Sequence, residues 1–316
     1  MSITGIHHVA LVSSDLQRSR DYYTGVLGLR VVADETGAGN NLWVGGEAGG
    51  MGCLLSIEER PGAEPGREGV GGTHHFALLV ETRDGLLQWK RWLTDHGVAV
   101  NGPLDRHYFE SIYHRDPDGQ VIEIATRGAG WTRDEAPDAV GTEHRPPPEA
   151  MLKGNAERER IRAETWPEPV AAITGDLRFH IMHHVTVIGD DIERTHAFVH
   201  GALGLRRVKR TSNFDMPDSY HWYWGVGDGR PGTVVTYFER RGAAPVRPGP
   251  GQVDHYALSV PDGAALEEVR GRLAAAGYET GEIEDSGLFL GFLTRDPHGH
   301  PVEIVAGAGI GPEYAA

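Results

Sequence analysis

Gly5-Ile6-His7-His8-Val9 opens the first half of this chain, and Ile181-Met182-His183-His184-Val185 opens the second half with nearly the same residues. The two openings lie 176 positions apart, and the same interval separates the Leu-Gly-Leu-Arg stretches at 27–30 and 203–206. Each half also closes alike, with Arg-Asp-Pro-x-Gly at 115–119 and 295–299. Self-similarity at a fixed interval is typical of a duplicated architecture.

Histidine and glutamate recur at matching places in the two halves. His75 and His255 lie 180 positions apart, and so do Glu123 and Glu303, which follow the two closing motifs. Imidazole and carboxylate groups are ligands for transition metals. The repeat therefore indicates a metal site built on a duplicated scaffold.

Each half contains the same pattern of elements twice, so the chain divides into four modules. In the first module, alternation at 8–12 predicts a strand, and Asp15 is placed to cap a helix that runs to Leu27. Gly28 ends that helix, and three strands are expected near 30–33, 41–44 and 53–57. Modules two to four, at 72–126, 179–240 and 252–306, repeat this order of strand, helix and strands.

These modules predict an α+β fold in which four βαβββ modules pair into two cup-shaped mixed sheets, because a single module buries only one face of its sheet. Residues 1–127 form the expected first domain of two modules, and 179–308 form the second. The stretch between them, 128–178, contains Pro146-Pro147-Pro148 and a charged run, and it predicts a linker with one short helix at 149–164.

The composition argues against several classes of partner and metal site. The 316 residues carry a formal charge of −15 without a basic patch, which argues against a nucleic-acid partner and favours a small substrate. Cys53 is the single cysteine, so neither a disulfide framework nor a thiolate metal cluster is expected. The sequence contains neither a secretion signal nor an apolar run long enough for a bilayer, so we expect a cytoplasmic protein without a membrane partner; a homo-oligomer is compatible with it.

The repeated module, with histidine in its first strand and glutamate in its last, resembles the vicinal oxygen chelate superfamily, which includes extradiol dioxygenases, glyoxalase I and bleomycin-resistance proteins. The chain resembles one subgroup, the hydroquinone-type ring-cleaving dioxygenases, more closely. The similar stretches are residues 73–75 and 108–113 in the first half and residues 208–211, 220–221 and 231–234 in the second half. In those enzymes the two halves occur in the opposite order. The resemblance therefore implies that modules two and three share one sheet, and modules one and four the other.

The resemblance implies that His75, Glu123 and His184 are the metal ligands. Two imidazoles and one carboxylate leave half an octahedron open, which suits Fe(II) with O₂, and Mn(II) also fits. Pairing of modules one and two would instead place His8 where His184 stands. Glyoxalase I needs a fourth ligand, a second glutamate, and alignment of the modules puts Thr236 at that position. A site with three ligands therefore fits better.

Residues before the glutamates distinguish the two halves. Tyr113 and Arg106 precede Glu123 by 10 and 17 positions, and the same steps back from the second glutamate reach Leu293 and Ser286. Ring cleavage needs proton donors and groups that stabilise developing negative charge. We therefore expect the catalytic site beside Glu123. A second triad, His8, His255 and Glu303, could bind metal, but we interpret it as a relic of duplication.

His74 and His183 each precede an expected ligand. The period of two in a strand would point them to the opposite face of the sheet. The resembling enzymes use such neighbours as proton donors near the metal, which a local bulge would permit. The resemblance thus implies four catalytic residues: Tyr113, His183, His74 and Arg106. Three further residues are candidates for lining the cup: His107, Tyr220 and His221.

The function predicted from these observations is an Fe(II)-dependent extradiol-type dioxygenase that opens a small dihydroxylated aromatic ring, a hydroquinone or catechol, with O₂. Such an enzyme would belong to the breakdown of aromatic compounds. The alternatives are a metal-dependent lyase or isomerase of the glyoxalase type, and a drug-binding protein of the bleomycin-resistance type that needs no metal.

Overall fold

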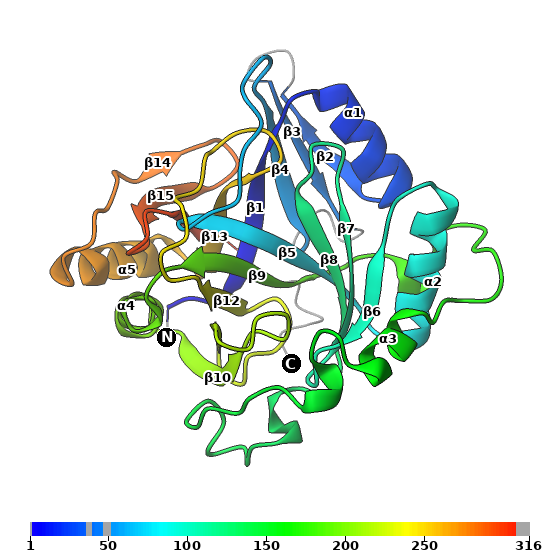
Figure 1. Cartoon of the computed structure of the whole chain (residues 1–316). Helices are drawn as coiled ribbons and strands as arrows, with labels where there is room; N and C mark the ends of the chain where they lie inside the picture. The colour runs from blue at the N-terminus through cyan, green and yellow to red at the C-terminus, as the bar shows by residue number, and fades with distance from the viewer. Residues whose placement is uncertain (1, 36–39, 47–51, 308–316) are drawn as a thin grey trace.

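Two curved sheets of eight strands form the centre of the molecule (Figure 1). The computed structural model describes residues 2–35, 40–46 and 52–307, so residue 308, the expected end of the second domain, lies outside the described ranges. Both sheets are mixed, with parallel and antiparallel neighbours. The expected α+β fold with two cup-shaped sheets is confirmed.

One sheet, here called the inner sheet, is built from modules two and three. Its strands follow the order β10-β11-β12-β9-β5-β8-β7-β6. Their bounds are β5 Gly72–Val80, β6 Asn101–Asp105, β7 Glu110–Arg115, β8 Val121–Thr126, β9 Met182–Gly189, β10 Arg206–Ser212, β11 Tyr220–Gly225 and β12 Val234–Glu239.

The other sheet, here called the outer sheet, is built from modules one and four. Its strands follow the order β14-β15-β16-β13-β1-β4-β3-β2. Their bounds are β1 Gly5–Ser13, β2 Arg30–Asp34, β3 Asn41–Gly45, β4 Leu54–Glu59, β13 Val253–Val260, β14 Glu284–Asp285, β15 Leu290–Arg295 and β16 Pro301–Ala306.

The sequence halves 1–127 and 179–308 therefore each contribute one module to each sheet. The pairing predicted from the swapped order, two with three and one with four, is confirmed. In each sheet the first strands of the two modules lie antiparallel at the centre, β5 against β9 and β1 against β13.

Helices cover the sheets, and local sequence explains where they begin and end. α1 (Leu16–Arg20) begins after Asp15, whose carboxylate accepts a hydrogen bond from the Arg18 N–H, and continues as a π-helical turn over Asp21–Val26. Gly28 then adopts φ +68°, a left-handed conformation that glycine tolerates. The α-helices of the other three modules are α2 (Arg83–Asp95), α4 (Ile192–His196, continued by a π-helical turn over Ala197–Ala202) and α5 (Gly263–Ala275).

The segment between β8 and β9 is more irregular than the modules. Its helix α3 (Ala156–Arg162) is shorter than the expected 149–164, because the first residues of that stretch form a separate 3₁₀ turn, Glu149–Met151. Two more 3₁₀ turns, Trp131–Arg133 and Gly175–Leu177, complete the segment. α3 packs beside β6, so this connection also covers the inner sheet.

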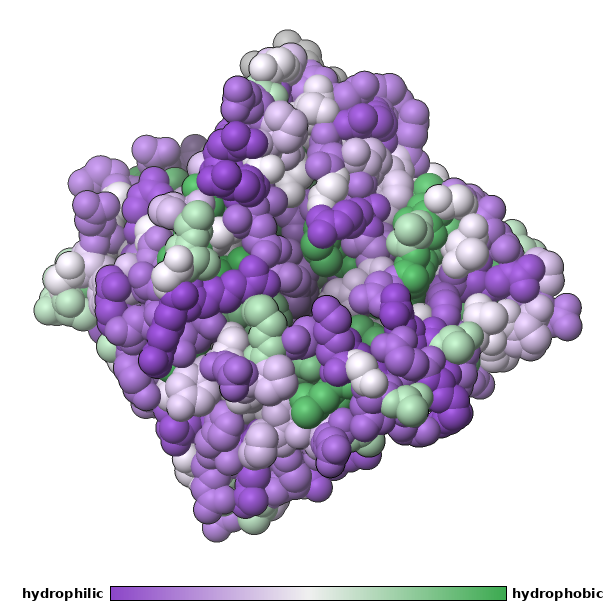
Figure 2. All heavy atoms as spheres, viewed as in Figure 1, coloured by the Kyte–Doolittle hydropathy of each residue, from purple (hydrophilic) through white to green (hydrophobic). Residues whose placement is uncertain are grey.

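The apolar core extends from one sheet to the other. Buried polar contacts also join the modules: the Tyr23 hydroxyl donates to Asp116 at 3.0 Å, and the Tyr237 hydroxyl donates to Asp296 at 2.9 Å. The face shown in Figure 2 is mostly hydrophilic, with apolar residues in small patches around a central hollow. Among the described residues, no helix is both long and apolar enough to cross a bilayer.

Candidate metal centre

Three neighbouring strands of the inner sheet bring together His75 from β5, Glu123 from β8 and His184 from β9. We call this set the inner triad. Oε2 of Glu123 lies 2.8 Å from Nε2 of His75 and 3.3 Å from Nε2 of His184, and the two Nε2 atoms are 3.2 Å apart. The structure thus brings His184, rather than His8, beside His75.

All three side chains of the inner triad are at least 96% buried. Among the described residues, no N–H or O–H points at Oε2 of Glu123 with hydrogen-bond geometry, despite the nearby imidazoles. A buried carboxylate oxygen without a hydrogen bond is costly unless a cation compensates it. Two imidazole nitrogens and this oxygen converge on one point, so the residues fit a divalent metal ion.

The charges agree with that fit. Burial alone would raise the pKa of Glu123, but positive charge on the adjacent rings of His184 and His75 lowers that pKa well below its usual range, so cationic charge at this point stabilises the carboxylate. Burial lowers the pKa of His75, in spite of the carboxylate beside it. A carboxylate and a neutral imidazole are the forms that bind metals.

Bulges at His74 and His183 orient the two histidines of the inner triad, His75 and His184. Pairing of β5 with β9 shifts by one residue between Thr73 and His75, and again at His183 on the other strand. The bulge turns each extra residue toward its neighbour, so His74 does not lie on the opposite face, as strict alternation would place it. Nδ1 of His74 lies 2.6 Å from Nδ1 of His75, and the corresponding atoms of His183 and His184 are 2.8 Å apart.

These contacts occupy Nδ1 of His75 and of His184, so Nε2 is the nitrogen of each ring that faces the place where a metal ion would bind. A metal bound at Nε2 requires the ligand proton at Nδ1, where an acceptor should hold it. Burial lowers the pKa of His183 to about 3 and that of His74 well below its usual range, so both are neutral and can accept. Nε2 of His74 in turn lies 3.4 Å from Glu68. The pairs therefore orient the rings of His75 and His184.

Tyr113 lies directly opposite Glu123 in the pairing of β7 with β8. Its ring centroid is 5.8 Å from that of His75, and Nε of Arg106 donates to its hydroxyl oxygen at 3.2 Å. Burial raises the pKa of Tyr113 above its usual value, although the Arg106 guanidinium acts in the opposite direction. The phenol therefore stays protonated near neutral pH and can donate its own hydrogen.

Sequence reasoning missed two hydroxyls beside the triad. Ser111, two residues before Tyr113 on the same face of β7, donates to Oε1 of Glu123. Thr186, two residues after His184, lies with Oγ1 2.9 Å from Nε2 of His75. Strand alternation from Tyr113 and His184 could have found both.

The fourth-ligand position holds a hydroxyl, as the module alignment predicted. Thr236 stands in β12 where Glu123 stands in β8, each two residues past the partner of a ligand histidine. Its Oγ1 donates to Thr186 at 3.0 Å and lies 2.8 Å from Nε2 of His221. Of the three proposed cup residues, His221 lines the site, His107 contacts Asp134 instead, and Tyr220 packs against His144.

Aromatic rings enclose the space in front of the triad. Phe109, Phe214 and Phe238 line it together with Tyr113 and Tyr223. The cavity is about 20 Å³, room for about one water molecule. Asp215, next to Phe214 in the β10–β11 connection, accepts from Arg106 at 3.3 Å and from Arg158 of α3. The linker helix thus braces one wall of the site.

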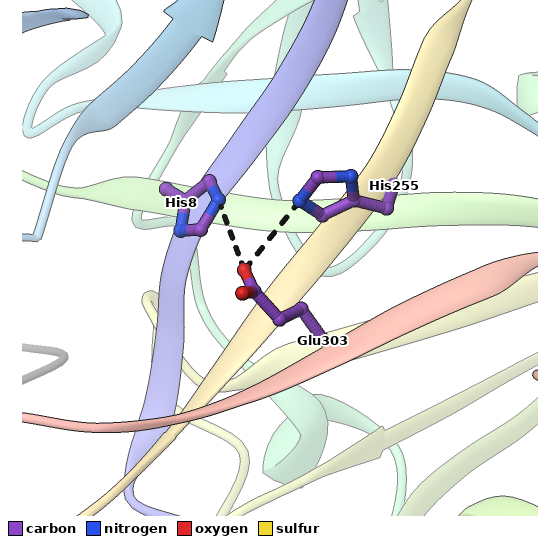
Figure 3. Close-up of side chains that lie close together, drawn as sticks. All are labelled: His8, His255 and Glu303. Carbon is purple, nitrogen blue, oxygen red and sulfur yellow. Dashed lines mark ion pairs between the residues drawn. The ribbon is translucent and has the colours of Figure 1, made fainter. Parts of the chain in front are cut away.

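A second cluster lies in the outer sheet, where His8 from β1, His255 from β13 and Glu303 from β16 point toward one another (Figure 3). We call this set the outer triad. Oε2 of Glu303 lies 3.4 Å from Nε2 of His8 and 3.5 Å from Nε2 of His255. His8 is buried, whereas the side chains of His255 and Glu303 are 19% and 17% exposed.

Comparison with known proteins identifies the family to which the chain belongs. The model of the Glyoxalase/Bleomycin resistance protein/Dioxygenase superfamily matches residues 5–124 and 181–304. The chain belongs to this superfamily. Its fold is similar to that of glyoxalase I from Zea mays, with a TM-score of 0.64 at 18% identity over 96% of this chain and 92% of that one.

Two relatives from Bacillus subtilis (strain 168) carry dioxygenase names. "Catechol-2,3-dioxygenase" is 28% identical over 302 residues, 93% of this chain and 94% of that protein. "Putative ring-cleaving dioxygenase MhqE" is 36% identical over 129 residues, so the match spans 40% of this chain and 41% of that protein. Proteins that are named for ring cleavage are thus similar to the chain.

Proposed function

We propose that this protein is a metal-dependent, extradiol-type ring-cleaving dioxygenase whose substrates are O₂ and a small dihydroxylated aromatic, a hydroquinone or a catechol. The inner triad would hold Fe(II), and the same donor set also suits Mn(II). The observation that carries the proposal is the buried phenol of Tyr113, which faces Glu123 and receives a hydrogen bond from Arg106. The ring-cleaving names of the relatives give it further support.

His75, Glu123 and His184 would bind the ion on one side and leave the opposite side open. When bound, Fe(II) supplies adjacent positions for a substrate oxygen and O₂ and lets electrons pass between them. The Ser111 hydroxyl donates a hydrogen bond to Oε1 of Glu123 and so holds the carboxylate in place while Oε2 faces the two imidazoles. The protein thus presents a fixed set of ligands, which a reaction with two bound substrates requires.

Tyr113 would donate a proton or hydrogen bond to the reacting oxygen atoms. The Arg106 N–H occupies an acceptor position on the phenol oxygen, which leaves the O–H free to point into the cavity. Negative charge grows on the substrate oxygens during ring opening, and a positioned donor stabilises that charge. Arg106 would orient the phenol and attract an anionic substrate oxygen, although its ion pair with Asp215 reduces that attraction.

The main role of His74 and His183 would be to orient the two ligand histidines, His75 and His184. Each faces the Nδ1 of a ligand rather than the open side of the triad, which supports a role in orientation and in holding the ligand proton. His74 also reaches Glu68, whose side chain is 36% exposed, so a proton on His74 has a path to solvent. This path is how His74 would take part in proton movement.

The aromatic wall suits a planar ring, but the space must open. About 20 Å³ accommodates one water and not a six-membered ring, so a wall residue has to move when substrate enters. Phe214 is the wall ring in the β10–β11 connection, and Asp215 beside it is tied by two ion pairs. Movement of this connection to admit the substrate would therefore have to break or lengthen the ion pairs of Asp215.

The experiment that tests the proposal is oxygen uptake by the Fe(II)-loaded protein across a panel of catechols and hydroquinones, with product spectra. We expect oxygen uptake and loss of substrate at equal rates, and neither under nitrogen. Turnover that persists under nitrogen would point to a lyase or isomerase. Tight drug binding by protein stripped of metal, with no turnover, would point to a sequestering protein.

A further inference from the structure

We propose that the outer triad is a second metal site, which binds a divalent transition-metal ion through Nε2 of His8, Nε2 of His255 and the carboxylate of Glu303. The three groups come from three strands of the outer sheet and converge in the same manner as the inner triad (Figure 3). The ion would join module one, which carries His8, to module four, which carries the other two ligands.

The groups that orient the ligands are repeated as well. β1 and β13 carry bulges at His7 and Asp254, the residues that precede His8 and His255. Nδ1 of His7 lies 2.9 Å from Nδ1 of His8, and Nδ1 of His255 lies 3.0 Å from the Asp254 carboxylate. A carboxylate on the far nitrogen of a histidine is a common second partner in metal sites, because it fixes the ring and makes Nε2 more basic.

The hydrophobic surroundings are repeated too. Phe109 packs on His183 and His184, with ring centroids 4.8 and 5.6 Å away. At the equivalent place in the outer sheet, Phe289 packs on His7 and His8, at 5.0 and 5.4 Å. The outer triad thus combines the bulges, the covering ring and an Nδ1 partner for each histidine, and one of these partners is the Asp254 carboxylate rather than a second histidine. Their joint presence favours a working metal site.

The outer site lacks the groups that would make it a ring-cleaving site. Leu293 lies opposite Glu303 in the β15–β16 pairing, where Tyr113 lies opposite Glu123. Two apolar rings lie beside His8 instead: the centroid of the Trp43 ring is 5.1 Å from that of His8, and the centroid of the Phe289 ring is 5.9 Å from that of Trp43. The ion would therefore serve to hold the first and last modules together. Because two ligands are partly exposed, it should exchange faster than an ion at the buried inner triad.

The test uses full-length, untagged protein stripped of metal by a chelator and then dialysed against Zn²⁺, with bound zinc measured by atomic emission. Zn²⁺ accepts two imidazoles and a carboxylate and avoids iron oxidation. We expect two zinc ions per chain in the parent protein, one in Glu303→Gln, one in Glu123→Gln and none in the double variant. One ion in both the parent and Glu303→Gln would overturn the proposal, and so would two ions in Glu303→Gln.

A second variant guards against misfolding of Glu303→Gln. Asp254→Asn removes the charge behind His255 and keeps the ligand, so the affinity of the outer site should fall by roughly 10- to 100-fold while the inner site is unchanged. Arg60→Gln is the matched control, since Arg60 binds the other oxygen of Asp254 at 2.9 Å and its loss should change affinity by no more than about fivefold. An unchanged affinity in Asp254→Asn contradicts the assigned role.

Thermal unfolding gives a readout that does not depend on turnover. An ion that binds only the folded state raises its melting temperature. Zn²⁺ should therefore raise the melting temperature of Glu123→Gln, which keeps the outer site, and leave that of the double variant unchanged. Equal shifts in the two variants would overturn the proposal. Zinc counts do not depend on ring cleavage, so a protein with two sites and no oxygenase activity would refute the proposed function alone.

Discussion

The inner and outer triads have the same types of side chain but different neighbours. Each has two histidines and a glutamate on three adjacent strands, with a bulge and an Nδ1 partner for every histidine. The inner triad is enclosed and lies beside Tyr113, whereas the outer triad is partly open and lies beside Leu293, which is about half exposed. The arrangement of the three side chains therefore follows from the repeated sheet, and the chemistry that we propose for each triad depends on residues of the flanking strand.

The largest expected effect separates the two glutamates. Glu123→Gln should lose the iron of the inner site, and oxygen uptake with an aromatic substrate should fall by roughly 10³-fold or more, because the ion's only carboxylate ligand is gone. Glu303→Gln should keep that iron and turn over within about twofold of the parent. Iron content by atomic emission and oxygen electrode rates measure both. Equal losses in the two variants would remove the functional distinction between the triads.

The sequence predicts the scaffold well because the relevant signals are local or repeated. Asp15 and Gly28 mark the ends of the first helix region, and the observed bounds agree with the predicted ones. The module pairing rests on the swapped order of the halves, and the sheet order confirms it. Strand β6 (Asn101–Asp105) completes the predicted βαβββ order of module two, although glycine and proline in its sequence are typical of a turn.

What the sequence could not predict depends on contacts between distant segments. A bulge is a property of two paired strands, so resemblance can suggest the orientation of His74 and His183, whereas alternation within one strand points them the wrong way. Phe214 and Asp215 reach the site because α3 anchors their loop through Arg158. The pattern of the linker indicates only a connector with a short helix, and its bracing role depends on where the chain folds back.

The second-largest effect is expected from Tyr113, which lies in β7 beside the strand that carries Glu123. Tyr113→Phe removes one hydroxyl from the inner site and keeps the ring, so turnover should fall by roughly 10²-fold, as for loss of one donor to a developing oxyanion. Iron content should not change, because the phenol is not a proposed ligand. Leu293→Ala, at the equivalent place beside the outer triad, should leave turnover unchanged. Steady-state kinetics of iron-replete protein decide this: a change confined to KM would indicate ordinary substrate binding.

A smaller effect is expected from the histidine pairs. His183→Gln removes the Nδ1 partner of His184, and the inner site should bind metal roughly 10- to 100-fold more weakly. His7→Gln removes the corresponding partner of His8 and should weaken the outer site alone. Competition with a chelator of known affinity measures both constants. If His183→Gln weakened neither site, the pairs would be packing features rather than ligand supports.

The smallest effect should come from Ser111, whose hydroxyl donates to Oε1 of Glu123, whereas Gly291 stands at the equivalent position near Glu303. Ser111→Ala leaves a buried carboxylate oxygen without that hydrogen bond, which costs roughly 1–3 kcal/mol in a folded protein. A bound cation compensates the same carboxylate, so much of this cost should disappear once the site is loaded. We therefore expect metal affinity to change by about tenfold or less, and turnover at saturating iron to stay within about threefold of the parent. A fall in turnover as large as that of Tyr113→Phe would mean that the position of the carboxylate, rather than the phenol, limits ring opening, and the contrast between the two triads would then rest on Ser111 and Gly291.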